Sequence, residues 1–172
     1  MKENTCCFTG HRPQKLPWGF DESDARCTYL KKYMYAVLSR AIRAGYTHFI
    51  SGMALGGDIY FAEAVLSLKE KYPHIQLECA IPYQKQPAAW GIQDRMRYRD
   101  ILEQCDTRTL LAKAYFRGCL LARNRYMVDQ SDLLLAAYME SSGGGTKSTV
   151  AYAEKKGLKI VYLPLTMGKT EE

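Results

Sequence analysis

The chain has 172 residues, of which 47% are hydrophobic and 24% charged, a balance that excludes a disordered protein and suits a domain with a sizeable core. The formal net charge is +6, which favours anionic ligands but does not reach the excess of a histone-like tail. We therefore expect a single domain over residues 1–167 and a polar, frayed tail over residues 168–172.

The cysteines and the apolar segments indicate where such a protein works. None of the six cysteines has the C-x-x-C spacing of a metal or redox site, so we expect reduced, buried thiols and no bound metal. No run approaches the ~20 apolar residues that span a membrane, and the N-terminus lacks the apolar stretch of a signal peptide. The sequence predicts a cytoplasmic protein with no membrane partner.

Hydrophobic periodicity alternates between strand and helix along the chain. In chain order, we expect a strand at 5–9, a helix at 23–44, a strand at 48–51, a helix at 58–71, a strand at 75–81, a helix at 93–105, a weaker strand at 107–112, a helix at 118–130, a strand at 132–138, a helix from the glycine run to Gly157, and a strand at 158–163. Ser23 is expected to cap the first helix and Gly45 to end it. This order predicts an α/β fold, a Rossmann-like three-layer sandwich with a mostly parallel sheet, in which the very apolar strand 132–138 is central.

Glycine-rich turns follow several of the expected strands. They cover residues 10–13, 51–58 and 142–146, and ligands of parallel sheets bind outside the carboxyl ends of the strands. Glycine allows close approach of the backbone, and a following helix offers free N–H groups to a phosphate. Arg12 adds a charged donor and Thr146 a hydroxyl. One such turn can serve chain reversal alone, but several at one rim favour a binding site.

The predicted site combines these turns with neighbouring polar residues. The residues expected to bind the ligand are Gly10, His11, Arg12, Pro13, Ser51, Gly52, Met53, Gly56, Gly57, Asp58, Pro82, Asn124, Arg125, Gly143, Gly144, Gly145 and Thr146. The acidic candidates for catalysis are Asp58, Glu63 and Asp129, although Asp58 suits a helix cap equally well and Asp129 suits a surface pair with Arg125. Neither the P-loop pattern nor the dinucleotide fingerprint occurs.

Basic and aromatic residues cluster before the strand at 132–138. Arg117, Arg123 and Arg125 occur close to three aromatic residues, namely Tyr115, Phe116 and Tyr126. Two interpretations remain open, since stacking rings and cations form single-strand nucleic-acid patches, whereas aromatic residues before a strand also pack in the core.

The motifs, taken together and in order, resemble the YpsA-like proteins of the SLOG superfamily. They are Cys7-Phe8-Thr9-Gly10-His11-Arg12-Pro13, the segment from Ile50 to Asp58, the segment from Arg123 to Asp129, and Gly144-Gly145-Thr146. The superfamily also holds the DNA-processing protein DprA (Smf) and the LOG cytokinin-activating enzymes. The resemblance covers nearly the whole chain. It implies a nucleotide-type ligand held by the first loop, the Ser-Gly loop and the Gly-Gly-Thr helix start, and links to bacterial cell division and to sensing of nucleotide-derived signals.

Three hypotheses for function follow. The first is a sensor or regulator that binds a nucleotide or an ADP-ribose-like ligand and changes contacts with a protein partner. The second is an N-glycosidase or phosphoribohydrolase acting on a nucleoside monophosphate, but Thr149 stands where the LOG motif has its glutamate, and the nearest candidate is Glu154. The third is DprA-like binding of single-stranded DNA. A homodimer formed through helices is compatible with each.

Overall fold

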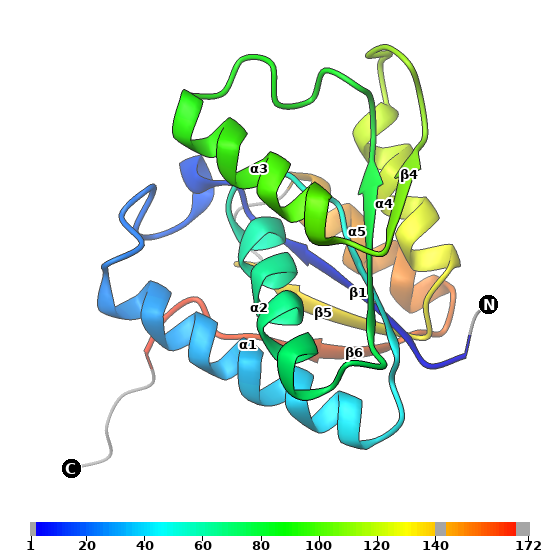
Figure 1. Ribbon diagram of the computed structural model, residues 1–172. Coiled ribbons are helices and arrows are strands. Elements are labelled where there is room, and N and C mark those ends of the chain that lie inside the picture. Colours follow the sequence, from blue (N-terminus) through cyan, green and yellow to red (C-terminus); the bar gives the residue numbers. More distant parts are fainter. Residues whose placement is uncertain (1–2, 140–143, 168–172) are drawn as a thin grey trace.

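A computed structural model describes residues 3–139 and 144–167, which form one layered α/β unit (Figure 1). Its elements, in chain order, are β1 (Thr5–Gly10), the 3₁₀ turn η1 (Pro13–Lys15), α1 (Ala25–Arg43), β2 (His48–Ser51), α2 (Gly57–Lys71), β3 (Gln76–Ile81), α3 (Ile92–Gln104), β4 (Thr107–Leu110), α4 (Cys119–Asp129), β5 (Leu133–Ala137), α5 (Gly144–Lys155) and β6 (Lys159–Tyr162). The predicted alternation is confirmed. The turn η1 was not predicted, because three residues are too few for a periodic signal.

All neighbouring strands of the six-stranded sheet are parallel, in the order β4-β3-β2-β1-β5-β6. This confirms the Rossmann-like prediction, with a sheet parallel throughout the described residues. The chain builds outward from β1 to β4, then returns to place β5 on the other side of β1. The connections that leave β1 and β5 therefore diverge at their carboxyl ends, which is the position where sheets of this type bind ligands.

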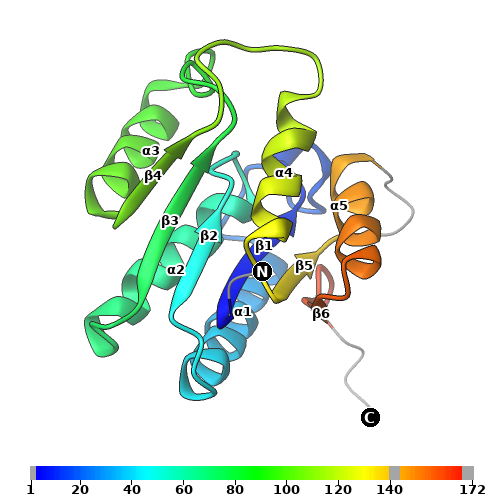
Figure 2. The same ribbon diagram turned by 90° about the vertical axis from the view of Figure 1, so that its right-hand side faces the viewer.

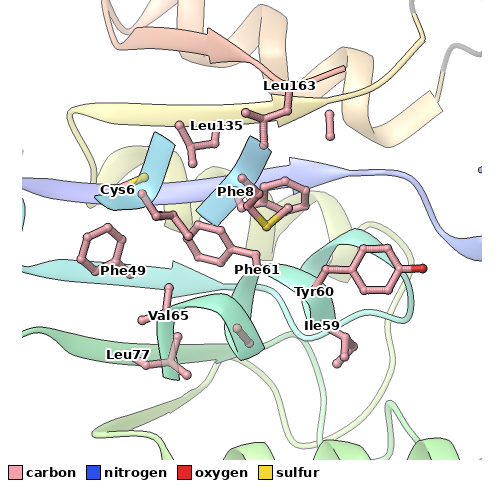
Figure 3. Packing of buried hydrophobic residues seen from close by; sticks show 14 of the residues in the cluster. Cys6, Phe8, Phe49, Ile59, Tyr60, Phe61, Val65, Leu77, Leu135 and Leu163 are labelled. Atoms are coloured by element: carbon pink, nitrogen blue, oxygen red, sulfur yellow. The ribbon is translucent and has the colours of Figure 1, made fainter. Parts of the chain in front are cut away.

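Alternating side chains of the strands separate two apolar layers. Cys6 and Phe8 of β1 pack with α1, α2 and α3, and the ring of Phe8 stacks on Phe61 with 5.3 Å between centroids (Figure 3). Cys7 belongs to the second apolar cluster, with residues of α4 and α5, the two helices on the opposite face of the sheet (Figure 2). The period-two alternation of an internal strand thus produces the three layers.

Two local expectations need correction. Asp24, not Ser23, caps α1, because its carboxylate accepts the N–H of Arg26 at 2.8 Å. The Ser23 hydroxyl donates to Asp21 instead. Every residue of β5 is buried, yet β5 is next to the edge strand β6, and β1 and β2 occupy the middle of the sheet. The strand β5 is apolar because helices pack on both faces of the sheet, as they do for any internal parallel strand.

Two further features agree with the sequence. Gly45 follows α1 with φ of 106°, the left-handed conformation that was expected to end this helix. The six cysteines are free thiols, and only Cys105 is more than slightly exposed. Among the described residues, no helix has the length and apolar character needed to cross a membrane.

Candidate functional site

A crevice of about 210 Å³ lies at the carboxyl ends of β1 and β5. It is formed by β1, η1, the loop after β2, and the N-terminal parts of α2, α4 and α5, which meet at one end of the sheet (Figure 2). Its lining residues are Phe8, Thr9, Gly10, His11, Arg12, Gln14, Lys15, Ala54, Asp58, Leu120, Arg123, Asn124, Gly145 and Thr146. Segments more than a hundred residues apart in sequence therefore share one site.

Two glycine loops next to this crevice pack closely against each other. The N–H of Gly57 donates to the carbonyl oxygen of His11 at 3.2 Å. A Cβ atom on Gly56 would lie 2.6 Å from that same oxygen, and one on Gly57 would lie 2.8 Å from the Phe8 ring. Gly56 also has φ of 90°, so both space and conformation require glycine here.

The start of α5 is fixed against the end of β1. Thr146 donates its hydroxyl to the carbonyl oxygen of Gly10 at 3.0 Å. The Lys15 ammonium lies over the first turn of α5, where a Cβ atom on Gly144 would be 2.7 Å from the Lys15 Nζ. The free N–H groups of a helix start and a nearby ammonium both favour a bound anion.

Lys15 was missing from the predicted site. Residues three apart in a 3₁₀ turn project to the same side, so Lys15 follows Arg12 across η1, and both line the crevice. Recognising that turn in the sequence would have identified the lysine. Gln14 and Leu120, which also line the crevice, had no comparable signal.

A buried arginine supports the loop after β2. Arg123 is 4% exposed, donates through Nη1 to the Gly52 carbonyl oxygen, and donates through Nε to Asn124 Oδ1 at 2.8 Å. A Cβ atom on Gly52 would lie 2.8 Å from its guanidinium. Position 52 therefore requires glycine, because any side chain there would collide with the Arg123 guanidinium.

Asp58 supplies the carboxylate of the crevice. Its Oδ2 accepts the N–H of Ala54 at 3.1 Å, which folds the loop onto the start of α2. Burial raises the pKa of Asp58, and the nearby positive charge of Arg123 opposes that shift. Burial also lowers the pKa of Arg123, since each charge is more costly in a buried wall than in water.

Ser51 and His11 act within the scaffold of the site. Ser51 Oγ donates to the carbonyl oxygen of Asp58 at 2.8 Å and accepts the N–H of Met53 at 3.2 Å. His11 Nε2 accepts the N–H of Met139 at 3.0 Å, so the imidazole is neutral in this arrangement. Burial, and then the charge of Lys15, lower the pKa of His11. The His11 bond connects the segments that follow β1 and β5, and the Ser51 bonds hold the loop after β2 against the start of α2.

The structure brings together only part of the predicted set. The predicted residues that line the crevice are Gly10, His11, Arg12, Asp58, Asn124, Gly145 and Thr146. The other described residues of the predicted set do not line it, namely Pro13, Ser51, Gly52, Met53, Gly56, Gly57, Pro82, Arg125 and Gly144. Gly143 lies outside the described residues.

Two of the acidic candidates lie elsewhere. Both Glu63 oxygens accept from Arg97 Nε at 3.1 Å, between α2 and α3. Asp129 accepts the hydroxyl of Tyr152 at 2.8 Å, and Arg125 lies over the same ring, 5.4 Å from its centroid. The surface pair of Arg125 and Asp129, one of the two interpretations of these residues, is replaced by contacts of both side chains with Tyr152 of α5.

The predicted nucleic-acid patch is divided in the structure. Arg123 is buried in the wall of the crevice, Arg125 faces α5, and the Tyr126 hydroxyl donates to Glu78 at 2.6 Å. Tyr115 and Phe116 remain exposed. Neither interpretation of the cluster therefore holds for all of its members.

Comparison with known proteins assigns the chain to a family. A sequence model described as the YspA SLOG family (YpsA) matches residues 6–167. The chain belongs to the YpsA family of SLOG proteins. This confirms the resemblance, and membership of the YpsA family points to a nucleotide-related function.

Relatives of the YpsA family protein come from bacilli and similar bacteria. A UPF0398 protein of Halalkalibacterium halodurans is 32% identical over 151 residues, which is 87% of this chain and 79% of the relative. UPF0398 proteins of Bacillus thuringiensis and Bacillus cereus are each 29% identical over 152 residues, 87% of this chain and 82% of each relative. The family model, which matches residues 6–167, covers every residue that lines the crevice.

Proposed function

We propose that the crevice binds the phosphate-bearing end of a nucleotide or of a nucleotide-derived ligand such as ADP-ribose, and that the protein is a sensor or regulator. The observation that carries this proposal is the position of the Lys15 ammonium over the first turn of α5. Helix N–H groups and an ammonium that converge on one crevice are complementary to a phosphate.

The charges around the crevice support an anionic ligand. Arg12 and Lys15 are both exposed at its mouth, and within the described residues neither forms an ion pair with a carboxylate. Arg123 in the wall is matched by Asp58. The two outer cations are therefore available to an incoming phosphate, for which bidentate arginine contacts are well suited.

The carboxylates favour binding over hydrolysis. Glycoside hydrolysis usually employs a pair of carboxylates flanking the scissile bond, whereas Asp58 is the one carboxylate among the described lining residues. Its Oδ2 already accepts the Ala54 N–H. Thr149, at the position of the LOG glutamate, is buried and donates to the Gly145 carbonyl oxygen at 2.8 Å.

A thermal-shift screen with product analysis tests the proposal. We expect AMP, ADP or ADP-ribose to raise the melting temperature, because a ligand at 100 times its Kd adds about 2.7 kcal/mol to the free energy of unfolding. Chromatography of the same mixtures should show intact ligand. A screen in which no nucleotide stabilises the protein contradicts the proposal, and release of free base would establish the N-glycosidase hypothesis instead.

A further inference from the structure

The loop between β4 and α4, residues 111–118, lies at the carboxyl end of the sheet (Figures 1 and 2), and two of its aromatic side chains are exposed. Tyr115 is 63% exposed and Phe116 is 49% exposed. We call this segment the aromatic loop. The ring of Tyr115 also contacts that of Tyr83 edge to face, with 5.4 Å between ring centroids. The segment that follows β3 therefore supports the Tyr115 ring.

Cations flank these rings. Lys113 and Arg117 are exposed on either side of Tyr115 and Phe116, and within the described residues neither forms an ion pair. Single exposed aromatic residues are common on protein surfaces. Adjacent rings between cations are instead the arrangement with which proteins stack bases and neutralise phosphates.

The aromatic loop leads directly into the wall of the crevice. The N–H of Cys119 donates to the carbonyl oxygen of Phe116 at 3.0 Å, a turn whose ends lie within about 7 Å of each other. Leu120, the next residue, lines the crevice. Lys15 and Leu120 thus line one crevice, and the aromatic loop ends two residues before Leu120.

The size of the crevice indicates what lies outside it. Pockets that enclose a whole small-molecule ligand usually measure about 300–1,000 Å³, and this crevice measures about 210 Å³. A nucleotide whose phosphate contacts Lys15 would place its ribose in the crevice and its base at the rim. An exposed apolar surface at that rim would cover the base and remove it from water.

We propose that the aromatic loop is a base-binding subsite, in which Tyr115 and Phe116 stack on the base of a nucleotide held through its phosphate at Lys15. This inference rests on the proposed function and narrows it. The preferred ligand is then a nucleoside phosphate, and a sugar phosphate without a base binds more weakly.

Calorimetric titration with AMP and with ribose 5-phosphate tests the subsite, because the two probes share the phosphate and the sugar. The variants are Tyr115→Ala, Phe116→Ala and the double variant. We expect the Kd for AMP to rise by about 5- to 100-fold, with the Kd for ribose 5-phosphate unchanged within about 2-fold. Phe116→Trp should retain the affinity for AMP, and Tyr35→Ala, which alters an exposed tyrosine of α1, should change neither value.

Each remaining outcome has a defined meaning. If AMP binding depends on Lys15 but not on Tyr115 or Phe116, the base subsite is overturned and the proposed function stands. The subsite is also overturned if the double variant weakens both probes equally. If the wild type binds neither AMP nor ribose 5-phosphate, or if Lys15→Ala leaves both affinities unchanged, the proposed function fails and the subsite fails with it.

Discussion

Thr146 donates its hydroxyl to the carbonyl oxygen of Gly10 at 3.0 Å, across 136 residues of sequence. The bond fixes the start of α5 at the end of β1, on the crevice side of the sheet. A buried hydroxyl in this position both satisfies a strand-end carbonyl and sets the direction of the N–H groups of α5.

Thr146→Val should reduce both stability and ligand affinity. The substitution keeps the shape but removes the donor, so the carbonyl oxygen of Gly10 loses its hydroxyl partner. We expect a loss of about 1–3 kcal/mol in the free energy of unfolding, measured by urea denaturation. Thr146→Ser is the matched control, and equal stability of the Val and Ser variants would contradict the assigned role.

Gly56→Ala should be much more destabilising than Gly118→Ala. Both glycines have φ near 90°, so both substitutions place alanine in the left-handed region, at about 1 kcal/mol or more. Only at Gly56 would the new Cβ also collide, 2.6 Å from the His11 carbonyl oxygen, whereas nothing lies within 4 Å at Gly118. Comparable melting temperatures for the two variants would show that the two loops do not pack as described.

Glu78 should make the protein sensitive to acid. The side chain is buried and accepts bonds from His48, Thr109 and Tyr126. Burial acts to raise the pKa of Glu78, but the bond from His48, followed by those from Tyr126 and Thr109, outweighs burial and lowers it. Because the folded-state pKa is below the unfolded one, this stabilisation is present above about pH 4.3 and is lost as the pH falls through the lowered pKa.

The comparison of Glu78→Gln with wild type measures this contribution. As the pH falls below about 4.3, the free energy of unfolding of Glu78→Gln should decrease less steeply than that of the wild type, because glutamine does not titrate. Glu103→Gln, on the exposed face of α3, should retain the wild-type slope. A Glu78→Gln profile parallel to that of the wild type would remove Glu78 from the account of acid sensitivity.

Cys105 should be the first of the six cysteines to react with iodoacetamide near neutral pH. The Cys79 thiol lowers the pKa of Cys105, against the effect of burial and with help from Arg108, and thiolates are the reactive form. The other five thiols are buried. Peptide mass spectrometry after brief alkylation should find the label on Cys105, and Cys105→Ser should abolish the fast phase. Prior labelling of Cys6 or Cys27 would contradict this prediction.

The order of the elements was predictable because period-two and period-3.6 patterns are local properties of the sequence. The segments at 48–51 and 58–71, for example, match β2 and α2 within one residue at each end. The N-cap residue of α1 could not be predicted, because Ser23 and Asp24 are adjacent and have equal capping ability. The path of the preceding loop decides between them.

Side-chain partners were the less predictable part of the site. Glu63 lies five residues after Asp58, and its direction depends on Arg97, which α3 brings from 34 residues away. Arg123 belongs to a basic run that suggests a surface, yet Gly52 leaves space for it in the interior. Such choices depend on which helices pack together, which no local pattern encodes.

Calorimetric titration of ADP-ribose into Lys15→Ala measures whether Lys15 and the start of α5 bind a phosphate. A hydrogen bond to a charged group contributes about 1.5–3 kcal/mol, so we expect the Kd of Lys15→Ala to exceed that of the wild type by about 10- to 100-fold. Lys32→Ala, which removes an exposed lysine of α1, should bind as the wild type does. Equal affinities for the Lys15→Ala and Lys32→Ala variants would contradict the account.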